Sequence, residues 1–297
     1  MKGGIFITPP IVCFVTYNRA GLNARNLTAL LNTTDDFELY IIDNHSQDDT
    51  WRFIEGLQDD RIKCKKRFAL NRHVVYAINY VLSKRKKDQY FILVESDIRI
   101  QTKDWVTRFL KAMEAFPNVG VMSACYWVAK KLRRPPQIVR NGDDTYYRHQ
   151  IVYLCCACMR PALFDCIGYF NEEVLWGDGD IWNRVNEFTH FKMGYIDTIQ
   201  ASHEQSIPCS ECLLKEQCSV LENSETCFDI RRRKRNHLNF VKLKKEKGSH
   251  RKFCNELRSG KRSVYCASIY DPDSIKHHYY NKEWAEEHLK LFIDLAN

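Results

Sequence analysis

The chain has 297 residues, of which 44% are hydrophobic and 12% aromatic, and its formal net charge is +8 at pH 7. This composition supplies enough apolar side chains for a core and excludes a chain that is disordered throughout. Its longest apolar run, 151–159, is far shorter than the roughly 18 residues of a membrane-spanning helix. Pro9 and Pro10 break the apolar stretch near the N-terminus, which argues against a secretory signal. We therefore expect a soluble, cytoplasmic protein without a membrane span.

Short apolar runs alternate with helix-length periodic segments up to about residue 203. Strands are predicted at 11–17, 37–43, 61–67, 90–96 and 119–128, and helices at 19–33, 44–57, 73–87 and 103–117. This alternation predicts parallel pairing with right-handed crossovers, and hence a doubly wound α/β sheet. Ligands of such sheets bind beyond the carboxyl ends of the strands, where Tyr17, Asp43 and Asp97 stand.

The second half of the chain changes character twice. The charged stretch 130–150 reads as a mobile flap, whereas 151–188 is apolar and passes into a helix, and 192–200 predicts a last strand. Beyond residue 206 the composition shifts to Cys, Lys and Arg. We therefore predict two units, a domain at 1–205 and a Cys-rich, basic C-terminal region at 206–297.

Two carboxylates end the apolar run 90–94, in the sequence Glu95-Ser96-Asp97. Alternate residues of an extended chain point to the same face, so Glu95 and Asp97 would present their oxygens together. Such a pair is either a cation site or a repulsive contact. A strand end followed by a capped turn is the plain structural alternative.

Several short segments, in this order and at these spacings, resemble the family 2 glycosyltransferases of the GT-A fold. The segments are VTYNR (15–19), IIDNHSQDDT (41–50), NRHVVYAIN (71–79), LVESD (93–97), IGYFNEE (167–173) and WGDGDIWNR (176–184). The resemblance covers roughly residues 10–205 and leaves the remainder unexplained. It implies a GT-A mixed sheet and an enzyme that moves a sugar, with inversion, from a nucleotide-sugar donor to an acceptor hydroxyl.

The resemblance also implies a donor site. Glu95, Ser96 and Asp97 stand where the family keeps its acidic metal motif, with Glu95 in place of the usual Asp. They would hold Mn²⁺ or Mg²⁺, which neutralises the departing diphosphate. His203 matches a histidine that many members place beside the metal, and imidazole suits Mn²⁺; a lone histidine is otherwise structural.

The nucleotide is expected at the strand ends, with a UDP-sugar as the leading donor. Asp43 resembles the acidic residue that hydrogen-bonds the base or ribose, and Thr16, Tyr17 and Asn18 resemble the loop that packs on the base. Arg72, in the segment LNRH (70–73), is a candidate for a phosphate contact, although surface arginines are common. Without the resemblance, 42–50 is an ordinary turn and helix cap.

The segment WGDGDIWNR resembles the family's Glu-Asp-x-Asp-Leu-x-x-Arg, with Gly177 in place of Glu. Carried over, Asp178 is the general base that takes the proton from the acceptor hydroxyl. Asp180 is the alternative base, although a carboxylate at the opening of a helix is also an ordinary cap.

The C-terminal region contributes a separate signal, which lies among the 13 cysteines of the chain. In a reducing compartment such a count favours free thiols and metal ligation over disulfides. Cys209, Cys212, Cys218 and Cys227 can close a tetrahedral Zn²⁺ site, an iron–sulfur cluster being the second choice and four free thiols the third. Cys155, Cys156, Cys158 and Cys166 read as core residues.

Basic residues follow these cysteines, at 231–236 and 242–252. They favour contact with a phosphate backbone, although a solvated helix face is the simpler account. The nearby tyrosines, which would either stack on bases or form a small core, are Tyr265, Tyr270, Tyr279 and Tyr280. DNA carrying a hydroxymethylated pyrimidine is therefore the leading acceptor, flipped from the duplex to reach the base. The alternatives are a cell-surface glycan, a peptide or a small hydroxylated compound, and a non-catalytic nucleic-acid-binding protein on a degenerate transferase scaffold.

Overall fold

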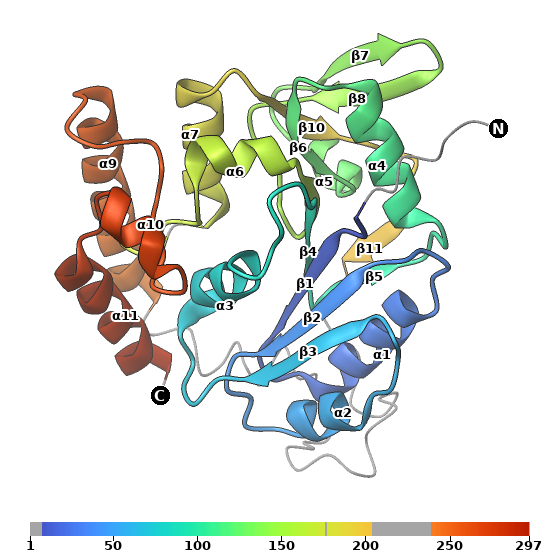
Figure 1. The fold of residues 1–297 in the computed structure, drawn as a ribbon, viewed down its shortest axis with the longest axis horizontal. Helices are drawn as coiled ribbons and strands as arrows, with labels where there is room; N and C mark the ends of the chain where they lie inside the picture. The colour runs from blue at the N-terminus through green and yellow to red at the C-terminus, as the bar shows by residue number, and fades with distance from the viewer. Residues whose placement is uncertain (1–7, 176, 204–238, 297) are drawn as a thin grey trace.

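The computed structural model describes residues 8–175, 177–203 and 239–296 (Figure 1). Within them, a nine-stranded mixed sheet with the order β3-β2-β1-β4-β9-β6-β10-β8-β7 forms the centre of the molecule. Its strands are β1 (Ile11–Thr16), β2 (Glu38–Asp43), β3 (Ile62–Arg67), β4 (Phe91–Glu95), β6 (Val119–Ser123), β7 (Gln137–Asn141), β8 (Asp144–Arg148), β9 (Cys156–Met159) and β10 (Lys192–Tyr195). The predicted α/β class with a mixed GT-A-like sheet is confirmed.

The first four strands of the sheet, β3-β2-β1-β4, are all parallel, as crossovers through helices require. The crossovers between them use α1 (Ala20–Leu31), α2 (Thr50–Gly56) and α3 (His73–Leu82). Further along the chain lie α4 (Trp105–Ala115), α5 (Tyr126–Ala129), α6 (Pro161–Ile167) and α7 (Asp178–Phe188). β9 interrupts the parallel order, because it runs antiparallel to both β4 and β6.

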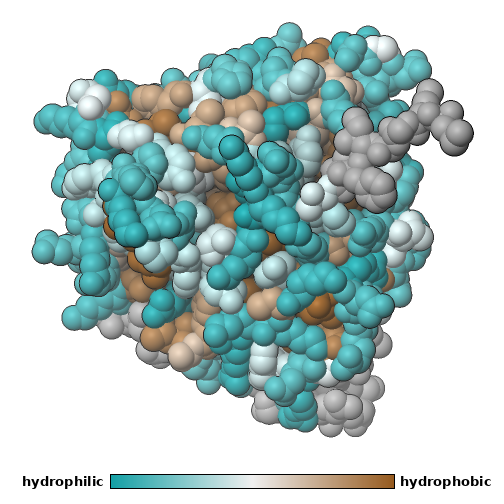
Figure 2. Space-filling model, viewed as in Figure 1, coloured by the Kyte–Doolittle hydropathy of each residue, from teal (hydrophilic) through white to brown (hydrophobic). Residues whose placement is uncertain are grey.

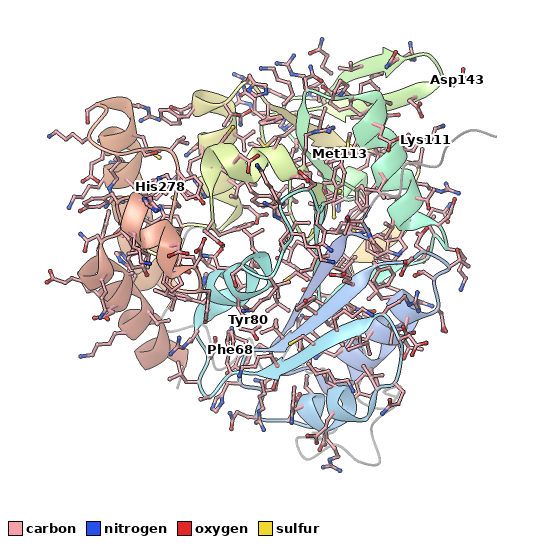
Figure 3. All side chains as sticks on the ribbon, in the orientation of Figure 1. Phe68, Tyr80, Lys111, Met113, Asp143 and His278 are labelled. Carbon is pink, nitrogen blue, oxygen red and sulfur yellow. The ribbon has the colours of Figure 1, made fainter. Side chains whose placement is uncertain are left out.

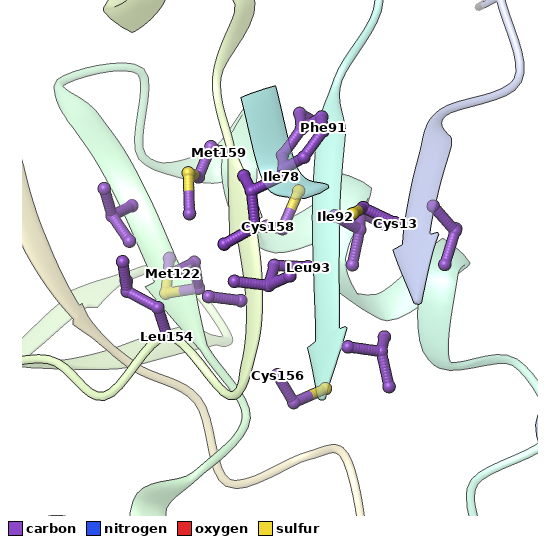
Figure 4. Packing of buried hydrophobic residues seen from close by; sticks show 14 of the residues in the cluster. Cys13, Ile78, Phe91, Ile92, Leu93, Met122, Leu154, Cys156, Cys158 and Met159 are labelled. Carbon is purple, nitrogen blue, oxygen red and sulfur yellow. The ribbon is translucent and has the colours of Figure 1, made fainter. Parts of the chain in front are cut away.

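The apolar runs become the buried centre of the sheet. Every residue of β1 is buried, and so are those of β6 and β9. Figure 4 shows Cys13, Cys156 and Cys158 packed among Leu93, Met122 and other apolar side chains of this core. Cys156 and Cys158 are thus core residues as predicted, whereas Cys155 and Cys166 are only partly buried.

The stretch 130–150 is not a loop, and this prediction was wrong. Residues 137–148 form the hairpin β7–β8, whose outer strand extends the edge of the central sheet (Figure 1). The reversal falls at Gly142-Asp143, between the paired residues Asn141 and Asp144. Gly142 has φ +56, and Gly at the first central position is typical of a two-residue hairpin turn. Charged side chains on an edge strand hid the alternation, because such strands commonly carry them.

The extended chain also does not continue through Asp97. β4 ends at Glu95, residues Ser96 and Asp97 form a turn, and β5 (Ile98–Ile100) then pairs with β11 (Ala201–His203) in a separate antiparallel ribbon. The prediction that Glu95 and Asp97 share one face of a strand is therefore wrong, because the turn rotates Asp97 away from the register of β4. The β5–β11 pairing brings His203 opposite Ile98 instead.

The C-terminal helices are α9 (Asn239–Arg258), α10 (Pro272–His277) and α11 (Lys282–Ala296), which lie against α3, α6 and α7 (Figure 1). A small second core joins Phe253, Leu257 and Cys266 of this region to Val174. Gly168 forms an isolated β-bridge with Cys266. The two backbones are so close that a Cβ on Gly168 would lie 2.4 Å from the Cys266 carbonyl oxygen, so a side chain does not fit there. The boundary at 205/206 stays a prediction, since 204–238 lie outside the described residues.

None of the helices in the described ranges is long and apolar enough to cross a membrane.

Candidate active site

The carboxyl edge of the parallel strands gathers the predicted donor-site residues. The register places Thr16 of β1 beside Asp43 of β2, and Val15 beside Glu95 of β4. The hydroxyl of Thr16 is buried and has no hydrogen-bond partner among the residues described. Because buried polar groups are normally satisfied, such an atom at a strand end marks a place where a ligand can bind.

Strained backbone gathers at the same edge. Asn18 and Arg19 after β1, His45 after β2 and His73 at the start of α3 all have positive φ. For residues other than glycine this conformation costs about 1–3 kcal/mol and is concentrated at functional sites. The Asn18 conformation is held by its contacts, since its amide donates to Ser46 Oγ at 2.8 Å and its side chain accepts from the Gln47 amide at 2.7 Å.

Asp43 is fully buried and already engaged. Its carboxylate accepts hydrogen bonds from the amide and the hydroxyl of Ser46, and Arg67 Nε lies 3.4 Å away. Burial raises the pKa of Asp43, and the Ser46 and Arg67 contacts partly oppose that rise. Asp43 therefore shapes the β2–α2 loop from within.

Arg72 belongs to a neighbouring loop that is tied to the first one. Its amide donates to Asn44 Oδ1 at 2.9 Å, and Asn44 Nδ2 donates to Asn71 Oδ1 at 2.8 Å. The guanidinium of Arg72 is partly exposed and interacts with the Tyr270 hydroxyl of the C-terminal region. The loops after β2 and β3 thus form one hydrogen-bonded unit.

Asp97 lies between two cationic or ionisable side chains. Its Oδ2 is 3.3 Å from Arg19 Nη1 and 3.5 Å from His203 Nε2. Burial raises the pKa of Asp97, but the His203 and Arg19 contacts outweigh burial and lower it below its usual value. Arg19 Nη2 also reaches the Ser96 hydroxyl at 3.3 Å, so the predicted Ser96 belongs to the same cluster.

Asp97 and His203 supply two side chains of the kind that bind a divalent cation, but not a complete set of ligands. Asp97 Oδ1 is buried without a hydrogen-bond partner in the described ranges, and an imidazole nitrogen stands beside the same carboxylate. Carboxylate and imidazole suit Mn²⁺, whose remaining positions are usually filled by phosphates and water. Within the described ranges, however, no three His, Cys, Asp or Glu side chains are placed to hold a metal ion, so Glu95 does not complete a three-ligand group.

Asp178 is the first residue of α7. Gly177 (φ +57) precedes it, and its Oδ2 accepts a hydrogen bond from the Leu154 amide at 3.0 Å. Burial raises the pKa of Asp178 to about 6, although the Leu154 amide and its own backbone amide oppose the rise. A carboxylate with this pKa is matched to proton abstraction near neutral pH.

Asp180 has a different environment. It is only 1% exposed, and its Oδ2 accepts from Arg184 Nε at 2.8 Å and Nη2 at 2.5 Å. Arg184, itself fully buried, also donates to the carbonyls of Ile167 and Tyr169. These contacts tie α7 to the loop after α6 and favour Asp178 over Asp180 as the base.

An aromatic pair borders Asp178. Tyr153, one residue before Leu154, is 36% exposed and stands edge-on to Trp182 with ring centroids 5.8 Å apart. Sequence reasoning missed Tyr153 and Arg19, although Arg19 ends the VTYNR segment that carried the resemblance. The predicted metal ligands Cys209, Cys212, Cys218 and Cys227 lie outside the described residues.

Comparison with known proteins agrees with this geometry. The parallel half-sheet with acidic residues at its carboxyl edge is the arrangement of a GT-A nucleotide-sugar transferase. Residues 11–169, more than half of the chain, match the sequence profile of glycosyl transferase family 2. The chain belongs to this family. No curated protein matches it.

Solved structures share the fold at low identity. GalNAc-T7 with UDP, GalNAc and Mn²⁺ matches with a TM-score of 0.52 and 12% identity, over 68% of this chain and 44% of that one. S. aureus TarS 1–349 in complex with UDP matches with a TM-score of 0.47 and 16% identity, over 64% of this chain and 58% of that one. The Pyrobaculum calidifontis mannosyltransferase PcManGT, in complex with GDP-Man and Mn²⁺, matches with a TM-score of 0.46 and 16% identity, over 66% of this chain and 61% of that one. The match therefore spans less than two thirds of each of these proteins.

Proposed function

We propose that this protein is a metal-dependent, inverting glycosyltransferase that moves a sugar from a nucleotide-sugar donor to an acceptor hydroxyl. The observations that carry the proposal are two acidic side chains, Asp97 beside His203 in the turn after β4 and Asp178 at the start of α7 with a raised pKa. Membership of glycosyl transferase family 2 supports it. The nucleotide would lie along Thr16, Tyr17, Asn18 and the loops that carry Asp43 and Arg72.

The reaction divides into two events that these residues serve separately. The acceptor oxygen forms a bond to the anomeric carbon from one face, and the bond from that carbon to the diphosphate oxygen breaks on the other. Asp178, deprotonated at neutral pH, accepts the proton of the attacking hydroxyl. Bound at Asp97 and His203, a divalent cation would supply the positive charge that stabilises the departing diphosphate.

Two solved neighbours are described with nucleotide ligands and Mn²⁺, GalNAc-T7 with UDP and PcManGT with GDP-Man. UDP is our first choice of nucleotide for this chain.

The test is turnover of UDP- and GDP-sugars with and without Mn²⁺, comparing Asp178→Asn with the control Asp104→Asn. Asp104 is an exposed carboxylate paired with Arg108 at the start of α4, so its loss leaves turnover unchanged. Equal turnover by both variants would remove Asp178 as the base.

For the acceptor we propose DNA that carries a hydroxymethylated pyrimidine. α9 flanks the helix that Asp178 opens, since Arg258 pairs with Glu187 at 2.9 Å. Exposed basic residues of this flank include Lys247, Arg251, Lys252 and Lys261, and the last three line a surface depression of about 500 Å³. Hydrophilic residues cover much of the surface over the C-terminal helices (Figure 2). A phosphate backbone is the partner that such a face recognises by charge.

The DNA acceptor is tested by binding and by transfer. Affinity for a duplex must fall steeply between two salt concentrations, because each phosphate contact releases counterions. Transfer to a duplex with hydroxymethylated cytosine, and none to the same duplex with plain cytosine, is the expected result. Salt-independent binding, or transfer only to a glycan, peptide or small hydroxylated compound, rules out DNA as the acceptor.

Two further elements of the proposal concern metal and compartment. We infer that Cys209, Cys212, Cys218 and Cys227 bind Zn²⁺, an assignment that metal analysis of the purified protein tests. We also propose a cytoplasmic location, with which the free thiols of the cysteines in the described ranges are compatible.

A further inference from the structure

The segment between α9 and α11 reaches back to the donor side of the sheet, although it lies outside the part of the chain that matches the family. Glu172, 1% exposed, is its anchor. The carboxylate accepts hydrogen bonds from the Ser268 hydroxyl at 2.6 Å, the Ile269 amide at 3.1 Å and the Tyr280 hydroxyl at 2.9 Å. A fourth donor, Asn79 Nδ2 at 2.8 Å, ties the same carboxylate to α3. A buried carboxylate satisfied in this way holds its partners in one arrangement.

This anchor places the ring of Tyr270 over the start of the β3–α3 connection. Tyr270 stacks on Phe68, with ring centroids 6.4 Å apart and planes 15° apart, and meets Tyr80 edge-on at 5.4 Å. Phe68 and Tyr80 lie side by side where β3 and α3 face the C-terminal helices (Figure 3). Aromatic pairs at these distances stabilise one another beyond their buried area.

Phe68 in turn is bonded to the loop after β2. Its amide donates to the Asp43 carbonyl at 2.9 Å, and its carbonyl lies 3.3 Å from His45 Nδ1. On its other side, the hydroxyl of Tyr270 interacts with Arg72. The ring of Tyr270 therefore packs on Phe68 at one end of the loop 68–72, and its hydroxyl interacts with Arg72 at the other end. Phe68 links the ring to the strand end at Asp43.

We propose that Tyr270 is a positioning residue for the nucleotide, a residue from the C-terminal region that fixes the loops bearing Asp43 and Arg72 in their binding arrangement. The proposal rests on the assignment of these loops to the nucleotide-sugar donor. It gives the C-terminal region a part in donor binding that is independent of any role in acceptor binding. A loop that is ordered before the nucleotide arrives loses less entropy on binding.

The test compares Tyr270→Phe and Tyr270→Ala with the wild-type protein in calorimetric titrations with UDP and with GDP, each in the presence of Mn²⁺. Tyr270→Phe keeps the ring but loses the Arg72 interaction, and we expect binding about 3- to 10-fold weaker at an unchanged melting temperature. Tyr270→Ala also loses the ring contacts, and we expect more than about 10-fold weaker binding.

Tyr90→Phe is the matched control. The Tyr90 hydroxyl accepts from Arg160 Nη1 at 3.2 Å, but Tyr90 precedes β4 and so lies at the amino edge of the sheet. Removing that Tyr–Arg contact must leave nucleotide binding unchanged. Amide hydrogen exchange supplies a second readout without nucleotide, in which Tyr270→Ala speeds exchange at Ser46 and Arg72.

The outcomes separate this inference from the proposed function. If the wild-type protein binds UDP or GDP and Tyr270→Phe binds it equally well, Tyr270 is not a positioning residue and the proposed function stands. If the wild-type protein binds neither nucleotide, the donor assignment and the inference both fail. Weaker binding by Tyr270→Phe, with Tyr90→Phe unaffected, supports the inference even where Tyr270→Ala does not fold.

Discussion

His203 Nε2 lies 3.5 Å from Asp97 Oδ2, because the antiparallel pairing of β11 with β5 sets His203 opposite Ile98, the residue after Asp97. β11 thereby lies beside β5, directly after the turn that follows β4. A strand order alone would not bring these two side chains together. The small ribbon does so, and it makes a carboxylate and an imidazole neighbours at the carboxyl edge of the sheet.

Removing this imidazole should weaken the metal site. We expect His203→Ala to reduce the apparent affinity for Mn²⁺ by roughly 10- to 100-fold, because Asp97 is then the remaining protein ligand of the pair. Titration of Mn²⁺ into the protein with saturating UDP measures the change. His277→Ala on α10, an exposed histidine, is the control. An unchanged Mn²⁺ affinity in His203→Ala would show that the imidazole does not bind the ion.

Activity should rise with pH through the pKa of Asp178. Burial raises that pKa to about 6, and a general base works only in its deprotonated form. We therefore expect kcat/KM to fall about tenfold for each pH unit below 6 and to level off above 7. A pH–rate profile without an inflection near 6 contradicts the role of Asp178.

The same burial predicts that function and stability oppose each other at Asp178. A folded-state pKa above the ordinary 3.8 means that the ionised carboxylate destabilises the fold at pH values above about 6. Asp178→Asn removes this charge and keeps an oxygen for the Leu154 amide. We expect it to be inactive, yet more stable by about 1–3 kcal/mol at pH 7.5 in urea unfolding. At pH 4 the gain should vanish.

The buried pair Asp180–Arg184 should matter for stability. Arg184→Ala leaves the Asp180 carboxylate buried without its cation and removes the Arg184 donor from the Tyr169 carbonyl, whereas the Ile167 carbonyl keeps the Cys266 amide. We expect the free energy of unfolding to fall by about 3–5 kcal/mol. Arg258→Ala, which breaks the exposed pair with Glu187, should leave the free energy of unfolding close to that of the wild-type protein. Similar losses in the two variants would contradict the assignment of a structural role to Asp180.

Gly168 should tolerate no side chain, because the bridge to Cys266 docks the C-terminal region there. A Cβ would overlap the Cys266 carbonyl oxygen and the Tyr265 ring, and φ is +63. Left-handed strain and overpacking together predict a loss of about 3 kcal/mol or more for Gly168→Ala. Gly142 has φ +56 with open space around it, so Gly142→Ala isolates the strain alone, about 1–2 kcal/mol. Equal effects in urea unfolding would refute the close approach.

The sequence was sufficient for the fold where apolar periodicity was strong. The buried run at β1, and the stripe of α4 with Trp105, Phe109 and Met113, folded as periodicity predicted, because burial dominates their energetics. The periodicity did not reveal the strands β7 and β8, because the edge strand carries polar residues on both faces. There the Gly142-Asp143 turn was the local signal that composition obscured.

The sequence supplied candidate residues for the site, but not the contacts between them. The resemblance named Asp97, His203 and Asp178, but the turn at Ser96, the Arg19–Asp97 pair and the Leu154 amide are products of tertiary packing. Arg19 lies far from Asp97 in sequence, and a left-handed residue carries no pattern of its own. Such contacts follow from which loops the sheet order brings together, and local sequence does not encode that order.

The central claim is that Asp97 and His203 bind the cation that stabilises the departing diphosphate. Anomalous diffraction at the manganese edge, from crystals grown with UDP and Mn²⁺, tests it most directly. We predict one manganese ion coordinated by Asp97, His203 and oxygens of the diphosphate. An ion bound elsewhere, or a diphosphate held by Arg19 and Arg72 without any manganese at Asp97, would contradict the account.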